Sequence, residues 1–270
     1  MRIGFVLAEL STGSSLSMWP AVASMFPSGG EDTLVVFSGG RLNSPNPLES
    51  MRNTIYRFVN PDNLEGTIIW SSSLTGHAKS KDVMTTFKSM LAYPLVTIDG
   101  KTEDYPEIPD VRFDAYEGSK RIVEHCIEHH NAKRIAYIRG PENHNSAQER
   151  FQAYLDALQS HGIQVDKTLV SDPMPWDAGD DAVRQLLDKR KKIPGKDFDY
   201  LFCASDLMLY KASQELMRHG FEIGQDVFVC GFNDSLESRL LKTPVTTVRL
   251  PYAGLGVNSV LAFRTVAEGK

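Results

Sequence analysis

The sequence contains little cysteine and no long apolar run. None of its apolar stretches approaches the roughly 20 residues that a membrane-spanning helix needs. The chain leads almost at once into Ile3–Leu7, a run too short for the apolar core of a secretory signal peptide. Its three cysteines, Cys126, Cys203 and Cys230, form no Cys-x-x-Cys pair and are expected to be buried thiols. These features favour a cytoplasmic protein without membrane contact.

Excess positive charge is also lacking. The 270 residues include 29 Lys and Arg against 34 Asp and Glu, a formal net charge of −5. Because binding to phosphate backbones needs a positive surface, we expect no direct nucleic-acid contact by this chain. The hydrophobic fraction of 41% and charged fraction of 23% are those of an ordinary globular protein and argue against a disordered or coiled-coil chain.

The signature motifs of common enzymes are missing as well. No Gly-x-Gly-x-x-Gly follows the first apolar run, and neither a phosphate-binding loop nor a Gly-x-Ser-x-Gly nucleophile elbow occurs. We therefore expect no enzymatic activity and no cofactor. An enzyme whose active site has no recognised motif is the alternative that this leaves open.

Two histidines have a spacing seen among zinc ligands. His125 and His129 stand four residues apart on a predicted helix, but Cys-Ile-Glu separates them and no third ligand is apparent. We interpret them as exposed side chains at a helix end and expect no metal site.

Short apolar runs alternate along the chain with longer segments of helical period. Most runs are apolar on both faces, which is typical of parallel strands covered by helices on both sides. The predicted strands are Ile3–Leu7, Thr33–Phe37, Gly66–Trp70, Pro94–Ile98, Arg134–Ile138, Tyr200–Cys203, Val227–Cys230 and Val245–Leu250. The predicted helices include Gly118–His130, Ser146–Gly162, Asp177–Ile193 and Asp206–His219. This alternation predicts an α/β protein with doubly wound sheets, in which the polar segment Asp99–Pro109 joins two lobes.

An ordered set of six motifs is more specific than this alternation. The motifs are Phe113–Gly118, His129–Pro141, Ala147–Phe151, Cys203–Met208, Gly220–Asp234 and Thr243–Arg249. Together they resemble the effector-binding core of LacI/GalR-type transcriptional regulators, which has a type I periplasmic-binding-protein-like fold. The resemblance is strong from about Asp110 to Gly256 and weaker before it.

The resemblance implies two Rossmann-like lobes joined by three crossovers, with a ligand closing them like a hinge. The crossovers are expected near Asp99–Glu103, Gly231–Asn233 and Leu250–Tyr252. The N-terminal lobe would comprise residues 1–101 and 232–250, and the C-terminal lobe residues 102–231 and 251–270.

The resemblance also implies which residues meet a ligand in the interlobe cleft. Arg150 takes the place of the family's helix-opening arginine and would donate to hydroxyls or a carboxylate. Its side chain is expected to point toward the cleft and not to contribute to the core. Trp176 stands where an aromatic ring often covers a sugar or base, although a structural tryptophan is the alternative.

Other positions depart from the family or match it less closely. Asn233 replaces the first acid of a Gly-Phe/Tyr-Asp-Asp run, and Ser205, beside Asp206, replaces an Asn found in many members. These departures mean that the usual ligand cannot be transferred. The remaining candidate contacts are Asp99, Tyr252, Ser14 and Ser72.

We therefore expect a sensor domain that binds a small polar molecule, sugar-like in kind, as part of a transcriptional regulator or signalling protein. A stand-alone carbohydrate-binding protein for transport is the alternative. Family repressors carry a DNA-binding headpiece before this core, for which the residues before Ile3 leave no room, so an output module is expected outside the chain. A homodimer is also expected, through first-lobe helices that contain Met51, Ile55, Phe87 and Leu91.

Overall fold

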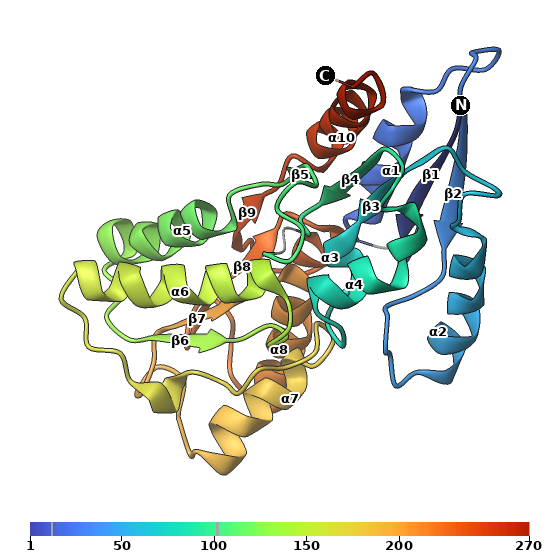
Figure 1. The fold of residues 1–270 in the computed structure, drawn as a ribbon. Coiled ribbons are helices and arrows are strands. Elements are labelled where there is room, and N and C mark those ends of the chain that lie inside the picture. Colours follow the sequence, from blue (N-terminus) through green and yellow to red (C-terminus); the bar gives the residue numbers. More distant parts are fainter. Residues whose placement is uncertain (12, 101–102, 270) are drawn as a thin grey trace. The chain divides into compact units, whose positions relative to one another are not determined.

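The computed structural model describes residues 1–11, 13–100 and 103–269, which form two compact units. The first unit comprises Met1–Phe113, Asn143–Asn145 and Pro251–Lys270, and the second comprises Asp114–Glu142 and Ser146–Leu250. Each contains one parallel β-sheet flanked by helices, which confirms the predicted α/β class (Figure 1). No helix among the described residues is long and apolar enough to cross a membrane.

The sheet of the first unit has the strand order β2-β1-β3-β4-β5. The strands are β1 (Arg2–Leu7), β2 (Thr33–Ser38), β3 (Gly66–Trp70), β4 (Leu95–Ile98) and β5 (Asp110–Val111). The helical elements are α1 (Ser15–Ser24), α2 (Pro47–Arg52), η1 (Asn53–Phe58), α3 (Ser71–Leu74), α4 (Ser80–Thr86), η2 (Lys88–Met90) and α10 (Tyr252–Ala267). Alternate residues of β1 supply two different cores, as period-two geometry requires. Phe5 packs with residues of α1 and α10, whereas Val6 packs with residues of η1 and α4.

The sheet of the second unit has the order β6-β7-β8-β9. Its strands are β6 (Ile135–Ile138), β7 (Tyr200–Cys203), β8 (Phe228–Asn233) and β9 (Thr246–Arg249). The helical elements are α5 (Ala115–His130), α6 (Asn145–Ser160), η3 (Lys167–Leu169), α7 (Gly179–Arg184), the π-helical turn η4 (Gln185–Lys189), α8 (Asp206–Arg218) and α9 (Leu236–Arg239). Helix α5 begins three residues before its predicted start, because the Asp114 side chain accepts a 2.7 Å hydrogen bond from the Glu117 amide and caps it.

The predicted division into lobes is wrong for two segments. Residues 232–250 were expected in the N-terminal lobe, but β8 pairs with both β7 and β9 in the second sheet. Residues 251–270 were expected in the C-terminal lobe, but α10 buries Phe263 in the core of the first unit. The crossover expected at Gly231–Asn233 lies inside a strand, and the boundary expected at 101 falls near Phe113, after β5.

A buried carboxylate holds the second sheet to the start of α8. Asp206 is fully buried and accepts hydrogen bonds from the Ser235 amide at 2.8 Å and the Thr247 hydroxyl at 2.7 Å. Burial raises the pKa of this carboxyl, and the two hydrogen bonds act in the opposite direction. Gly231 on β8 leaves room for it, since a Cβ there would collide with the carboxylate. Asp206 thus joins α8, β9 and the loop after β8.

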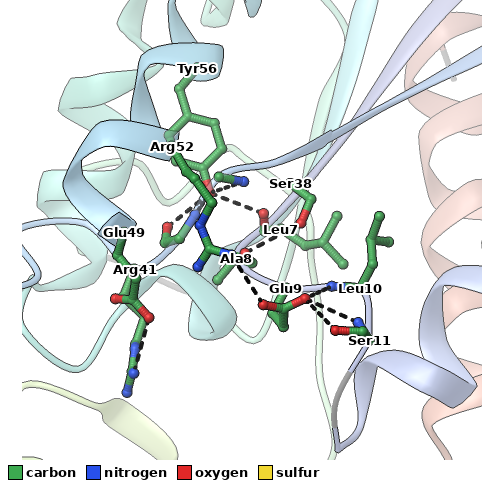
Figure 2. A network of polar contacts seen from close by, with 12 residues as sticks. Leu7, Ala8, Glu9, Leu10, Ser11, Ser38, Arg41, Glu49, Arg52 and Tyr56 are labelled. Carbon is green, nitrogen blue, oxygen red and sulfur yellow. Dashed lines mark hydrogen bonds and ion pairs between the residues drawn. The ribbon is translucent and has the colours of Figure 1, made fainter. Parts of the chain in front are cut away.

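A buried phenol plays a comparable part in the first unit (Figure 2). The Tyr56 hydroxyl accepts from the amides of Gly39 and Gly40 at 3.2 and 3.0 Å. It also lies within donor distance of the carbonyls of Leu7, 3.0 Å, and Gly40, 2.9 Å. Burial raises the pKa of Tyr56 to about 12, despite the opposing hydrogen bonds from the two glycine amides. This one hydroxyl fixes η1 to the ends of β1 and β2.

Replacement of Asp206 should destabilise the second unit strongly. Asp206→Ala removes two charge-assisted hydrogen bonds, so the free energy of unfolding should fall by about 3–5 kcal/mol. Urea unfolding followed by circular dichroism measures the change, with the exposed Asp177→Ala as the matched control. Equal stability of the two variants would show that Asp206 does not hold α8.

The Tyr56→Phe variant keeps the ring and removes only the hydroxyl. Because two buried amides lose their acceptor, the free energy of unfolding should fall by about 1–3 kcal/mol. The exposed Tyr93→Phe serves as the control, with no change expected. A Tyr56→Phe protein as stable as the wild type would contradict the assigned role.

Candidate functional site

Ligands of parallel α/β sheets bind at the carboxyl ends of the strands, so these ends are the place to look for a site in each unit. In the second unit, residues 139–141 follow β6, residues 204–206 follow β7 and residues 234–235 follow β8. Five of the predicted contacts belong to this unit: Arg150, Trp176, Ser205, Asp206 and Asn233.

Arg150 reaches this edge from α6 and is only 4% exposed. Its Nη1 donates a 2.6 Å hydrogen bond to the carbonyl of Ala204, which directly follows β7. Its guanidinium carbon lies 3.9 Å from the ring centroid of Phe232 and 5.7 Å from that of Trp176. The expectation that Arg150 does not contribute to the core is therefore wrong, since its side chain is buried and lies close to two aromatic rings.

Trp176 is half-buried in the loop before α7. Its six-membered ring lies against Gly140, where a Cβ would stand 2.8 Å from two ring atoms. Only glycine at 140 lets the indole take this place after β6. The indole and the guanidinium therefore belong to one cluster at the carboxyl edge of the second sheet.

Ser205 and Asp206 are positioned by the fold itself. The Ser205 hydroxyl accepts a 3.3 Å hydrogen bond from the Met208 amide and so caps α8, and the residue is 4% exposed. Asp206 bonds to Ser235 and Thr247, as described above. The two side chains thus serve the start of α8. By contrast, Asn233 is half-buried at the last position of β8, with a positive φ of 127°.

The structure brings together two of the four candidates in the first unit. The Trp70 indole donates a 3.0 Å hydrogen bond to the Ser72 hydroxyl, and its ring centroid lies 6.2 Å from that of Tyr252. Asp99 follows β4 directly, is 8% exposed and has a φ of 50°. Ser14 is half-buried beside α1, and its side chain makes no capping hydrogen bond to that helix.

A carboxylate that sequence reasoning missed lies at the end of β1 (Figure 2). Glu9 accepts hydrogen bonds from the Leu10 amide at 2.9 Å and from the Ser11 amide and hydroxyl at 3.1 and 2.8 Å. Its other oxygen lies 3.6 Å from an Arg52 nitrogen. Burial alone would raise the pKa of Glu9, but the hydrogen bonds and Arg52 outweigh it and lower the pKa. Glu9 is therefore ionised at neutral pH.

The sequence held a signal for Glu9 but none for Phe232. Glu9 is the first charged residue after the predicted strand Ile3–Leu7, whereas the prediction for the following loop named Ser14. Phe232 lies in an apolar stretch next to Asn233, where a buried ring is indistinguishable from a ring that supports an arginine.

The sequence pattern of the periplasmic binding protein-like domain family matches residues 123–263. The matched region contains every strand of the second sheet and most of α10.

Curated relatives are bacterial regulators. The HTH-type transcriptional regulator CelR of Thermobifida fusca is 34% identical over 151 residues, 56% of this chain and 43% of the relative. The HTH-type transcriptional repressor CytR of Escherichia coli K12 is 28% identical over 165 residues, 61% of this chain and 47% of the relative. The chain spans less than half the length of these two proteins.

Solved structures of the same kind match nearly the whole chain. A LacI family transcriptional regulator from Mycobacterium smegmatis has a TM-score of 0.83 at 23% identity, covering 99% of this chain and 91% of that one. A complex of the transcriptional regulator CelR with cellobiose has a TM-score of 0.78 at 24% identity, covering 99% and 78%. At such identities the likeness to solved structures shows the fold alone. Together with the match to the family's sequence pattern, it identifies the family. The chain belongs to the periplasmic binding protein-like domain family, in the form found in regulators of the LacI/GalR type.

Proposed function

We propose that this domain senses a small sugar-like molecule through the carboxyl edge of its second sheet and passes the signal to an output module elsewhere in a longer regulator. The observation that carries the proposal is the cluster of Arg150, Trp176 and Phe232 in the second unit. The cellobiose complex of a structural neighbour supports a sugar as the ligand class.

The chemistry of the cluster suits a polyhydroxy ligand. An indole face packs against the C–H face of a sugar ring, and a guanidinium offers five donors to hydroxyls or a carboxylate. Phe232 and the Ala204 carbonyl hold the guanidinium in place, so little side-chain entropy is lost when a ligand binds. Asn233 would add an amide that both donates and accepts.

In the first unit, taken by itself, the proposed contacts are Ser72, Tyr252, Asp99 and Ser14, and we add Glu9 to this proposal. Trp70 holds Ser72 and contacts Tyr252, so these two groups have a common support. We assign no catalytic role to any of these residues, in keeping with relatives that are transcriptional regulators. The full regulator would act in the cytoplasm, where its DNA-binding or signalling partner lies.

The indole of Trp176 gives the sharpest test of ligand binding. A thermal-shift screen over mono- and disaccharides, cellobiose included, should identify a sugar that raises the melting temperature. Calorimetry should then show that Trp176→Ala weakens binding about tenfold, which corresponds to about 1.4 kcal/mol. The sugar should be recovered chemically unchanged.

The matched control is Phe228→Ala, which removes a partly exposed ring at the opposite, amino end of β8. It should bind the sugar like the wild type. Arg150→Lys, which keeps the buried charge but loses the planar fork, should weaken binding without unfolding the domain. If Trp176→Ala and Arg150→Lys both bind with wild-type affinity, the assigned edge is wrong.

We also propose a homodimer that uses the exposed apolar face of α2 and η1. Leu48, Met51 and Phe58 are 65, 63 and 60% exposed. Phe87, expected in this contact from the sequence, is fully buried and packs against Tyr56, so that expectation is wrong. Ile55 and Leu91 are half-buried and pack against the same core.

Sedimentation at tens of micromolar should show a dimer of the wild-type chain. Met51→Glu places a charge in the proposed contact and should shift the chain toward monomer, because a buried unpaired charge is costly. Leu261→Glu, on the exposed face of α10, is the control. A wild-type monomer, or a dimer that both variants leave intact, would rule out this contact.

A further inference from the structure

Three histidines lie close together at the carboxyl end of α5, and none of them belongs to the proposed ligand site. His125 is half-buried, whereas His129 and His130 are exposed. The Nε2 atoms of His125 and His130 lie 3.0 Å apart, and the two rings meet edge to face with centroids 4.8 Å apart. The His129 ring lies 5.0 Å from that of His125. The sequence showed a ligand-like spacing only for residues 125 and 129 and led us to expect no metal site, but the closest nitrogens belong to residues 125 and 130.

The separation of these two nitrogens fits shared coordination of one ion. Imidazole nitrogen binds zinc at about 2.0–2.1 Å, so two such ligands at right angles lie about 3.0 Å apart. Without metal, the same separation suits a hydrogen bond in which one neutral imidazole donates to the other. Because His130 is exposed, its ring can turn until both lone pairs meet at one point.

His130 stands at the end of a row of stacked aromatic rings. His130 stacks on Tyr200, with centroids 6.3 Å apart, and Tyr200 stacks on Phe228 at 5.1 Å.

We propose that His125 and His130 bind one divalent transition-metal ion of the class that prefers imidazole: copper, nickel or zinc. The described residues contain no group of three or more His, Cys, Asp or Glu side chains placed to hold a metal ion, so the site has two protein ligands and water completes the coordination. Affinity should follow the order Cu²⁺ above Ni²⁺ and Zn²⁺.

The site stands apart from the proposed sugar site within the second unit. Tyr200 is the first residue of β7, so the histidines lie by the amino ends of the strands, whereas Ala204 and Trp176 lie by the carboxyl ends. Metal binding therefore does not rest on the proposed function, and neither result decides the other.

Calorimetric titration of the untagged, full 270-residue chain with NiCl₂ and CuCl₂ at pH 7.5 tests the proposal. The wild type should bind one ion per chain. Removing one of two linked ligands ends their cooperation, so His125→Ala and His130→Ala should each weaken binding by about tenfold or more. His129→Ala, and His77→Ala in the first unit, should bind like the wild type.

Two outcomes would overturn the assignment. One is a wild-type chain that binds no more tightly than the double variant His125→Ala/His130→Ala. The other is a loss in His129→Ala as large as that in His130→Ala, since this would mean that the residues four apart form the site. Circular dichroism of each variant confirms that the exposed substitutions leave the fold intact.

Discussion

The carboxyl edge of the second sheet depends on one buried positive charge. Removing a guanidinium from water is costly unless its charge and donors are compensated. For Arg150, the Ala204 carbonyl accepts one N–H, and the faces of Phe232 and Trp176 lie over the cation. Cation–π contacts can each contribute about 2 kcal/mol when desolvated. The arginine thereby links α6, the end of β7, the end of β8 and the loop before α7.

This arrangement makes the edge rigid. A guanidinium that is already packed against aromatic rings would not have to be ordered further for a ligand to bind. Gly140 admits the indole, and Gly231 admits the Asp206 carboxylate beneath the same edge. These two glycines at the strand ends therefore leave the space that the indole of Trp176 and the carboxylate of Asp206 occupy. The first unit has a comparable arrangement, since the Tyr56 hydroxyl fixes the end of β1 and the loop after β2.

The sequence predicted the parallel sheets because apolar runs such as Ile3–Leu7 and Tyr200–Cys203 fill strands buried on both faces. It did not predict which sheet receives β8 and β9, or which unit receives α10. Those assignments depend on pairing between strands that are distant in sequence, such as the pairing of Cys230 with Thr246. The composition of a strand does not show which other strand it pairs with. The two-residue strand β5 was too short to leave an apolar run.

The candidate site was predictable in part. Family resemblance led to Arg150 and Trp176, and the structure places both in one cluster. The burial of Arg150 could not be read from helical spacing, because Phe232 comes from a strand 82 positions later in the chain (232 − 150). Family resemblance also named Ser205 and Asp206, and the structure adds that both side chains position the start of α8. His130 was overlooked because a spacing of five is not a usual ligand spacing on a helix.

Hydrogen–deuterium exchange with and without the sugar found by screening tests the central claim most directly. The account predicts slower exchange upon binding in residues 139–150 and 204–206, with the amino ends of β7 and β8 unchanged. Uniform protection of the whole chain, or protection confined to segments away from the Arg150 cluster, would contradict it.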